Sequence, residues 1–140
     1  MNVSISQTSD LPTCLRVREI VFMQEQGVSL EDELDGLDPD CLHLLALDDG
    51  MPVGTARVHI EVDVAKIGRV CVLRSHRGKG LGEKLIRAAV TLAKAQTGVR
   101  NAKLSAQVQA LPFYEKLGFT VKGPVYDDAG IDHRDMVMVL

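Results

Sequence analysis

Three glycines stand at every second position of the segment RGKGLG, which covers residues 77–82. An apolar run that ends at Leu73 precedes this segment, and a helix-like pattern follows it. Glycine weakens regular structure, so this many glycines at a strand-to-helix junction indicate that something approaches the backbone closely. The start of a helix carries about half a positive charge, to which Arg77 and Lys79 add formal charge. The segment therefore predicts a binding site for a pyrophosphate.

Two common nucleotide-binding motifs do not match this segment. A P-loop needs Lys and then Ser or Thr directly after its last glycine, whereas Glu83 and Lys84 follow Gly82. The dinucleotide fingerprint needs G-x-G-x-x-G, whereas the chain has G-x-G-x-G in mid-sequence, after strands that read as antiparallel. A nucleotide-binding module is therefore disfavoured, although anion binding by backbone amides is not.

With its surroundings, the segment resembles the acyl-CoA motif Q/R-x-x-G-x-G/A of the GNAT superfamily of N-acyltransferases, through Arg77, Gly80 and Gly82. The stretch FYEKLGF at residues 113–119 resembles the aromatic helix ending of that family. VREIVF, AQVQALPFYEKLGF and GIDHRDM are similar to a small bacterial subgroup, the ElaA/YjcF-like proteins. The resemblance covers essentially the whole chain. It implies a mixed α/β (α+β) fold, with a mostly antiparallel central sheet flanked by helices, in a single domain over residues 1–140.

The resemblance also implies how acetyl-CoA is held, with no metal. Backbone groups of one strand would bind the pantetheine arm, and these are Val70, Cys71 and Val72. The pyrophosphate would bind at Arg77, Gly78, Lys79, Gly80, Leu81 and Gly82. Tyr114 would protonate the departing thiolate, because a phenol with a pKa of about 10 keeps its proton at neutral pH. The alternative for Tyr114 is an aromatic side chain that only anchors its helix.

Two positions depart from the family pattern. Many relatives have Asn seven residues before the tyrosine, where this chain has Gln107, which can still bond an amide of the cofactor. Many relatives also carry a Glu on the strand before the glycine motif as general base, but KIGRVCV contains Arg69 and no carboxylate. The general base is therefore left open by the sequence.

The acceptor is expected to be an amine, of a small molecule or a peptide, which must lose a proton before it attacks. Residues 25–40 contain seven acids, among them Glu33, that could attract a cationic acceptor. The alternative is a solvated acidic loop. His133 follows a loop at the start of a strand and is a candidate acceptor-site residue. His43 lies inside an apolar strand and is read as a core residue rather than a base, and His59 and His76 are read as surface residues.

These side chains need a scaffold, and hydrophobic periodicity predicts its elements. Helices are expected over residues 10–26, 81–97 and 111–118, with a loop or short helix over 27–40. Strands are expected over residues 2–7, 41–48, 52–62, 66–73, 102–109, 119–123 and 133–140. The turn signal DDGM joins the second and third strands, and the last strand is expected to be buried on both faces.

Composition limits the class of protein. The 140 residues suit one domain, and a net charge of −3 argues against nucleic-acid binding. No apolar stretch is long enough for a membrane span, and the first ten residues lack the features of a signal peptide. Cys14, Cys41 and Cys71 show no metal-binding or disulfide spacing, so we expect reduced thiols in the cytoplasm. A homodimer is left open.

The sequence therefore predicts an acetyl-CoA-dependent N-acetyltransferase that works by direct attack in a ternary complex. Its rival is a non-catalytic acyl-CoA-binding or sensor domain, which the missing strand carboxylate favours and Tyr114 disfavours. A covalent route through Cys71 is discounted, because an apolar strand raises the pKa of a thiol.

Overall fold

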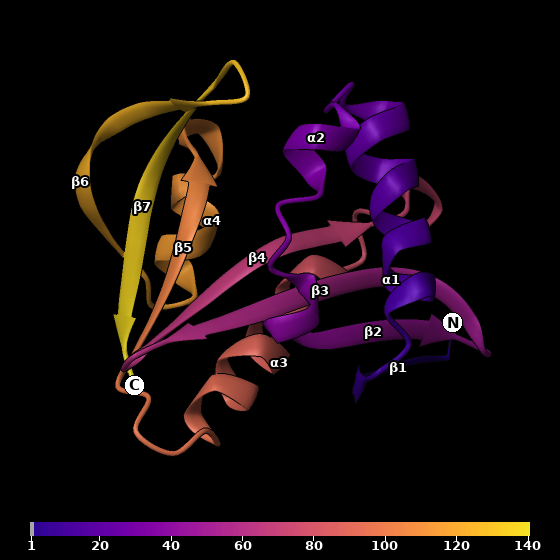
Figure 1. Cartoon of the computed structure of the whole chain (residues 1–140), viewed down its shortest axis with the longest axis horizontal. Helices are drawn as coiled ribbons and strands as arrows, with labels where there is room; N and C mark the ends of the chain where they lie inside the picture. The colour runs from indigo at the N-terminus through magenta and orange to yellow at the C-terminus, as the bar shows by residue number, and fades with distance from the viewer. Residues whose placement is uncertain (1) are drawn as a thin grey trace.

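Seven strands from both ends of the chain form one sheet, in the order β1-β2-β3-β4-β5-β7-β6 (Figure 1). The computed structural model describes residues 2–140. The strands are β1 (Val3–Thr8), β2 (Leu42–Asp48), β3 (Met51–Glu61), β4 (Val64–Val72), β5 (Asn101–Gln107), β6 (Thr120–Asp128) and β7 (Ile131–Val139). Neighbouring strands pair antiparallel, except that β4 and β5 run parallel. The expected mixed, mostly antiparallel sheet is confirmed.

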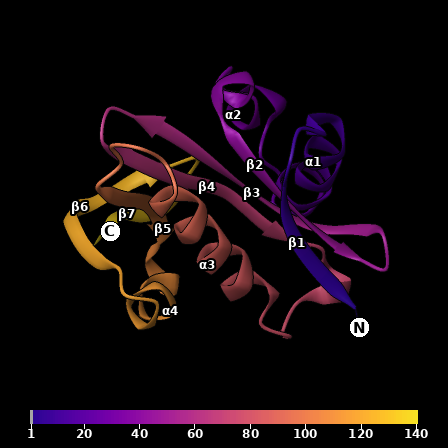
Figure 2. The same cartoon turned by 90° about the horizontal axis from the view of Figure 1, so that it is seen from below.

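Helices cover both faces of this sheet. They are α1 (Leu11–Arg18), α2 (Leu30–Glu33), α3 (Leu81–Lys94) and α4 (Leu111–Lys116), with a π-helical segment η1 (Glu19–Glu25) that continues α1. Short 3₁₀ turns are η2 (Asp38–Asp40), η3 (Arg74–His76) and η4 (Val108–Ala110). Figure 2 shows α1 and α2 on one face of the sheet and α3 and α4 on the other. Within residues 2–140 no helix has the length and apolar character needed to cross a membrane.

Local sequence explains several of these elements. Asp49 and Gly50 both have positive φ, 47° and 83°, which is the backbone of the two-residue type I′ turn that joins β2 to β3 as expected. On α3, buried side chains recur every three or four residues, and they are Leu81, Leu85, Ile86, Ala89 and Ala93. The amphipathic helix predicted over residues 81–97 is thereby confirmed, with its end at Lys94.

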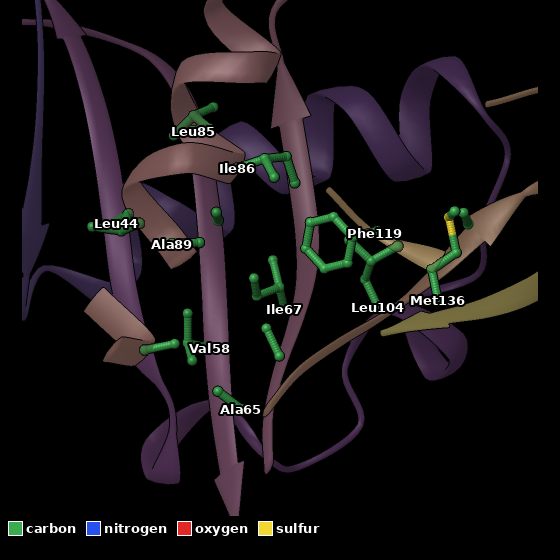
Figure 3. Close-up of a cluster of buried hydrophobic side chains, with 14 of the residues drawn as sticks. Leu44, Val58, Ala65, Ile67, Leu85, Ile86, Ala89, Leu104, Phe119 and Met136 are labelled. Atoms are coloured by element: carbon green, nitrogen blue, oxygen red, sulfur yellow. The ribbon is translucent and has the colours of Figure 1, made fainter. Parts of the chain in front are cut away.

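The main core lies between the sheet and the α3–α4 layer (Figure 3). Ile67 of β4, Leu104 of β5 and Ile86 of α3 meet there, each with at most 3% of its surface exposed. Phe119 and Met136 extend the core under β5 and β7. The junction between β4 and β5 therefore rests on a packed apolar layer that fixes where the two strands touch.

Three expectations from the sequence need correction. The helix expected over residues 10–26 is α-helical only to Arg18 and continues as the π-helical η1. β6 continues well past residue 123, because an edge strand with an irregular register tolerates Gly123 and Pro124. The last strand is not buried on both faces: Met136 alone is fully buried in β7, since α1 and α2 do not extend over that part of the sheet (Figure 1).

The parallel pairing of β4 and β5 is short. It runs from Val64 opposite Asn101 to Ile67 opposite Leu104 and then stops. Directly afterwards β4 bulges against β3, because Arg57 faces Gly68 and Thr55 faces Cys71, which leaves one extra residue on β4. From that point the two strands diverge (Figure 1). The divergence opens the sheet between residues 68–72 and 105–107.

An ion cluster holds the chain between α1 and β2 onto the sheet. Arg18 is 1% exposed; its Nε donates to Glu33 Oε1 at 2.6 Å and its Nη1 to Asp38 Oδ1 at 2.6 Å. Arg57 of β3 donates to Asp35 and, at 3.1 Å, to Asp38 Oδ1. The acidic run is therefore largely neutralised at these positions and is not a solvated loop there.

The pairing shifts the ionisation of the cluster. Hydrogen bonds from Arg57 hold the pKa of the Asp35 carboxyl well below its usual range, against the opposing effect of burial. Burial raises the pKa of Asp38, but the bonds from Arg18 and Arg57 outweigh it and leave the pKa lowered. Both carboxylates therefore stabilise the fold above the pKa of an unfolded Asp, about 3.9. This stability is lost as pH falls through the lower folded-state pKa values.

Replacing Arg18 by Met should strongly destabilise the protein, because Glu33 and Asp38 would stay buried without their cation. We expect the free energy of unfolding at pH 7 to fall by about 3 kcal/mol in urea titrations. Between pH 5 and 3 the variant should also lose less stability than the wild type, since fewer native carboxylates resist protonation.

The matched control is Arg16→Met on the same helix, where the side chain is exposed and donates to Thr13. We expect this control to change stability by less than about 0.5 kcal/mol. Equal effects of the two substitutions would contradict a structural role for the ion cluster.

Candidate active site

A cavity of about 380 Å³ lies on the α3–α4 side of the point where β4 leaves β5. Its walls include the end of β4, the glycine turn, the first turn of α3, and α4. The residues proposed for acyl-CoA that line it are Val70, Cys71, Val72, Arg77, Gly78, Gly80, Leu81, Gly82 and Tyr114. Residues expected at opposite ends of one cofactor therefore share one cavity. Lys79 and Gln107 do not line it, and their proposed contacts with CoA stay predictions.

The backbone conformation of the turn at residues 77–82 explains why glycine occupies two of its positions. Gly78 and Gly80 have φ of 75° and 79°, a region that other L-residues rarely adopt. Gly80 ends the turn in the left-handed conformation, and no side chain caps the helix that follows. Its carbonyl accepts from Lys84 N at 3.1 Å, so the N–H groups before Lys84 have no acceptor within the helix. This end of α3 can therefore donate several N–H groups to an anion.

Arg77 adds a positive charge beside these amides. Its Nε donates to the carbonyl of Val72 at 2.9 Å, and its Nη2 lies 2.7 Å from Glu25 Oε2 of η1. The two contacts fix the guanidinium across the end of β4. Cys71 lines the same cavity, but burial raises the pKa of its thiol to about 12. This thiol therefore stays protonated at neutral pH and is a poor nucleophile.

Tyr114 lies on α4, between this cavity and a second one. Its ring packs edge-on against Phe113 and Phe119, with centroids 5.0 Å and 6.2 Å apart. Burial raises the pKa of the phenol, so the hydroxyl keeps its proton at neutral pH. The ring has the packing of a helix anchor, and the hydroxyl has the ionisation of a general acid.

The second cavity, of about 420 Å³, opens on the α2 side of the strand divergence. It shares Val70, Ile86 and Tyr114 with the first cavity. Its walls come from η1, the chain around α2, the middle of β3 and β4, the end of β5, and the β6–β7 hairpin. Glu33, Gln107 and His133 all line it. The structure thus brings both residues expected to bind the acceptor, Glu33 and His133, to the other side of Tyr114, and Gln107, which was expected to bind the cofactor, lies in the same cavity.

Glu33 lines this cavity but is not a free anion. Its side chain is 4% exposed, and besides Arg18 it lies 3.5 Å from Arg69 Nε. His133 is half-buried, and its Nδ1 lies 2.8 Å from the carbonyl of Ile131. A carbonyl only accepts, so Nδ1 carries the proton, and in the neutral ring Nε2 holds a lone pair. The ring also stacks on Tyr126, with centroids 6.2 Å apart.

The other histidines have structural surroundings. His43 is 6% exposed and donates from Nε2 to the carbonyl of Asp38 at 2.9 Å, which confirms its interpretation as a core residue. His76 is half-buried rather than a free surface residue, because Nε2 lies 2.7 Å from Asp48 Oδ2. His59 is half-buried and lines the second cavity.

Sequence reasoning missed two buried arginines that hold the acidic residues of the second cavity. Arg57 lies in the apolar run of β3, and Arg18 lies among the buried positions Cys14, Val17 and Val21. A charge at a core position of a helix or strand is itself a signal, because such charges are buried only when paired. The partners could not be read, because they lie 15 to 22 residues away in the chain.

Comparisons with known proteins identify the family to which this fold and site belong. The family model described as "Acetyltransferase (GNAT) domain" matches residues 17–140. YjcF of Bacillus subtilis, described as an uncharacterized N-acetyltransferase, is 41% identical over 122 residues, which cover 86% of each chain. ElaA of Escherichia coli is 30% identical over 132 residues, covering 91% of this chain and 86% of ElaA.

Among solved structures, an acyl-CoA N-acyltransferase from Pseudomonas aeruginosa superimposes with a TM-score of 0.87 at 31% identity, covering 98% of each chain. The comparisons support acetyl transfer and give no support to a non-catalytic sensor. The fold, the glycine turn and these relatives lead to one conclusion: the chain belongs to the GNAT family and is an acyl-CoA-dependent N-acetyltransferase.

Proposed function

We propose that the protein transfers the acetyl group of acetyl-CoA directly to an amine, with both substrates bound at once. The observation that supports this proposal most is the position of Tyr114 between two cavities that open on opposite sides of the β4–β5 divergence. One cavity has the N–H groups and the positive charge for a diphosphate. The other has room for an acceptor. The two substrates can therefore meet at the gap between the strands without a covalent intermediate on the protein.

In this proposal the cofactor binds along the first cavity. The diphosphate takes the N–H groups of residues 78–82, with Arg77 and Lys79 beside it, because a helix start with left-handed glycines favours an anion. Beyond Ile67, β4 has no β5 partner, so backbone groups of residues 70–72 can pair with the pantetheine amides, apart from the Val72 carbonyl that accepts from Arg77. Gln107, at the end of β5, is the candidate partner from the opposite strand.

The chemical step needs one acid and one base. The amine nitrogen attacks the thioester carbonyl, the C–S bond breaks, and the departing thiolate takes the proton of the Tyr114 hydroxyl. We assign the base to His133, whose Nε2 is free to take a proton from the attacking amine. The other candidates fit less well, since Asp35 and Glu33 are already paired with arginines. Glu33 lines the acceptor site beside Arg69, while its short ion pair with Arg18 fixes its position.

Several broader expectations belong to the same proposal. Acetyl-CoA is the donor, no metal takes part, and the acceptor is an amine of a small molecule or a peptide. Residues 1–140 act as one domain, because one sheet joins both ends of the chain. Cys14, Cys41 and Cys71 are free thiols, which suits the reducing cytoplasm.

The glycine turn gives a test of the cofactor site. Gly80→Asp places a carboxylate beside the diphosphate and forces a side chain into the left-handed region. CoA affinity measured by calorimetry should weaken at least about tenfold, or about 1.4 kcal/mol. Gly98→Asp is the matched control, because Gly98 also has positive φ, 81°, and open space around it, but lies beyond the other end of α3. Equal CoA affinity in the two folded variants would refute this site.

Tyr114→Phe tests the acid. The ring and its packing on Phe119 stay, so folding and CoA affinity should change little. Loss of the proton donor should lower kcat by at least about tenfold where chemistry limits the rate. Single-turnover measurements show the chemical step even where product release limits the wild type. A wild-type single-turnover rate in this variant would make Tyr114 a packing residue.

His133→Gln tests the base. Gln keeps a polar side chain of similar size but cannot take a proton from the attacking amine. We expect kcat/KM at pH 7 to fall about 10²-fold, with little change in CoA affinity. A wild-type kcat/KM in the folded variant would remove His133 from the mechanism.

A further inference from the structure

Arg69 stands at the bulge where β4 leaves β5. Its φ is 50°, a left-handed conformation that is uncommon and costly for a residue with a side chain. The extra residue of the bulge changes the direction of the side chains that follow it. As a result Arg69 reaches across to the last residues of α2 and lines the second cavity. Strained backbone of this kind is typical of functional sites, so it indicates a functional role for the position of this guanidinium.

Two carboxylates lie near Arg69, but both are committed to other arginines. Glu33 makes its short contact, 2.6 Å, with Arg18, and Asp35 binds the guanidinium of Arg57. The contacts of Arg69 with carboxylates are longer, 3.5 Å to Glu33 and 3.4 Å to Asp35. Arg69 is therefore the least compensated cation of the cluster.

The firmer contacts of Arg69 are with neutral groups. Its Nη2 donates to the carbonyls of Glu33 and Asp32, at 3.0 Å and 3.2 Å, and its Nε lies 3.3 Å from the Glu33 carbonyl. These bonds hold the guanidinium in one place. Within the described residues, Nη1 has no hydrogen-bond partner, and the side chain is 26% exposed. One end of a fixed guanidinium is thus free to bind a ligand.

The surroundings disfavour the charge of Arg69 in the free protein. Burial lowers the pKa of its guanidinium, and the positive charges of Arg57 and Arg18 lower it further. Lys66 lines the same cavity and has no ion pair within residues 2–140, and it pairs in register with His59 on β3. The β3–β4 wall of the cavity therefore carries positive charge that an anionic ligand would compensate.

We propose that Arg69 binds a carboxylate of the acceptor, so that the protein acetylates amines that also carry a carboxylate, as amino acids and short peptides do. This inference rests on the proposed function, because the cavity is the one assigned to the acceptor. A single negative charge suits the site, since a phosphate dianion would also face the carboxylates of Glu33 and Asp35. The carboxylate lies against β4, and the amine extends toward Tyr114 and His133.

Matched pairs of acceptors test the proposal. Amino acids and dipeptides are compared with their C-terminal amides, so that each pair keeps its amine and differs in the carboxylate. In the wild type, kcat/KM for CoA release should be at least about tenfold higher for the carboxylates. Arg69→Gln should reduce this preference to within about twofold, mainly through KM, and Arg69→Lys should keep part of it. Preference for free amino acids over dipeptides, or the reverse, identifies the source of the carboxylate.

Binding of the products separates this inference from the proposed function. Calorimetry with the CoA-bound protein compares N-acetyl amino acids with their N-acetyl amides, and no turnover is needed. Tighter binding of the carboxylates in the wild type, lost in Arg69→Gln, supports the anion site even if no acceptor is acetylated. Equal binding of carboxylates and amides overturns it even if amines are acetylated.

Arg87→Gln is the matched control, because this arginine lies on α3 with its side chain 61% exposed and lines neither cavity. It should keep the wild-type preference for carboxylates. Thermal unfolding and CoA affinity are measured for each variant, so that loss of the fold is distinguished from loss of the anion site. A folded Arg69→Gln protein that keeps the full preference refutes the role of Arg69.

Discussion

The active site depends on the early end of the pairing between β4 and β5. Two parallel strands would normally continue side by side and bury their backbone groups against each other. Here the pairing stops at Ile67 and Leu104, and the bulge that follows turns β4 away. Unpaired backbone groups inside a sheet are costly unless a ligand or water takes them. The gap is therefore maintained by packing around it, and it supplies hydrogen bonds that an amide-rich ligand can use.

Two interactions of different kinds hold the gap open. On one face, Ile86 and Phe119 fix the strands through apolar packing (Figure 3). On the other face, Arg18 and Arg57 tie the chain around α2 to β3 and close one side of the acceptor cavity. A buried ion cluster is a weak source of stability, because desolvation offsets much of the attraction. Its geometry is specific, however, and it sets carboxylates and guanidinium groups at fixed places in the cavity wall.

Features that depend on local sequence could be predicted. The glycines at 78 and 80, the Asp49–Gly50 turn and the apolar stripe of α3 each satisfy a requirement of the backbone or the core within a few residues. The resemblance to an enzyme family then placed Tyr114 and the glycine turn at one site, and they do share a cavity. Most of the residues that the sequence assigned to the cofactor therefore lie together, and their contacts with CoA stay predictions.

Features that depend on distant pairing could not be predicted. The bulge at Arg69 has no local signal, because it arises from how β4 meets β3. The sequence shows the acidic run as a free negative charge that could attract a cationic acceptor. In the structure, Arg18 of α1 and Arg57 of β3 pair with Asp38 and Asp35 of this run. β6 looked too short because Gly123 and Pro124 usually end a strand, whereas an edge strand tolerates both. The acceptor side is built from such long-range contacts, so the sequence says less about it.

One segment connects the two cavities directly. The π-helical η1 presents Phe22 to the second cavity, which Gln26 directly after it also lines, and its Glu25 binds Arg77 beside the glycine turn. A π-helical turn is wider than an α-helical one and is frequent at functional sites. At the proposed cofactor site, a bound diphosphate would compete with Glu25 for the guanidinium of Arg77. The same segment forms a wall of the second cavity, so the two proposed substrate sites share one element of the protein.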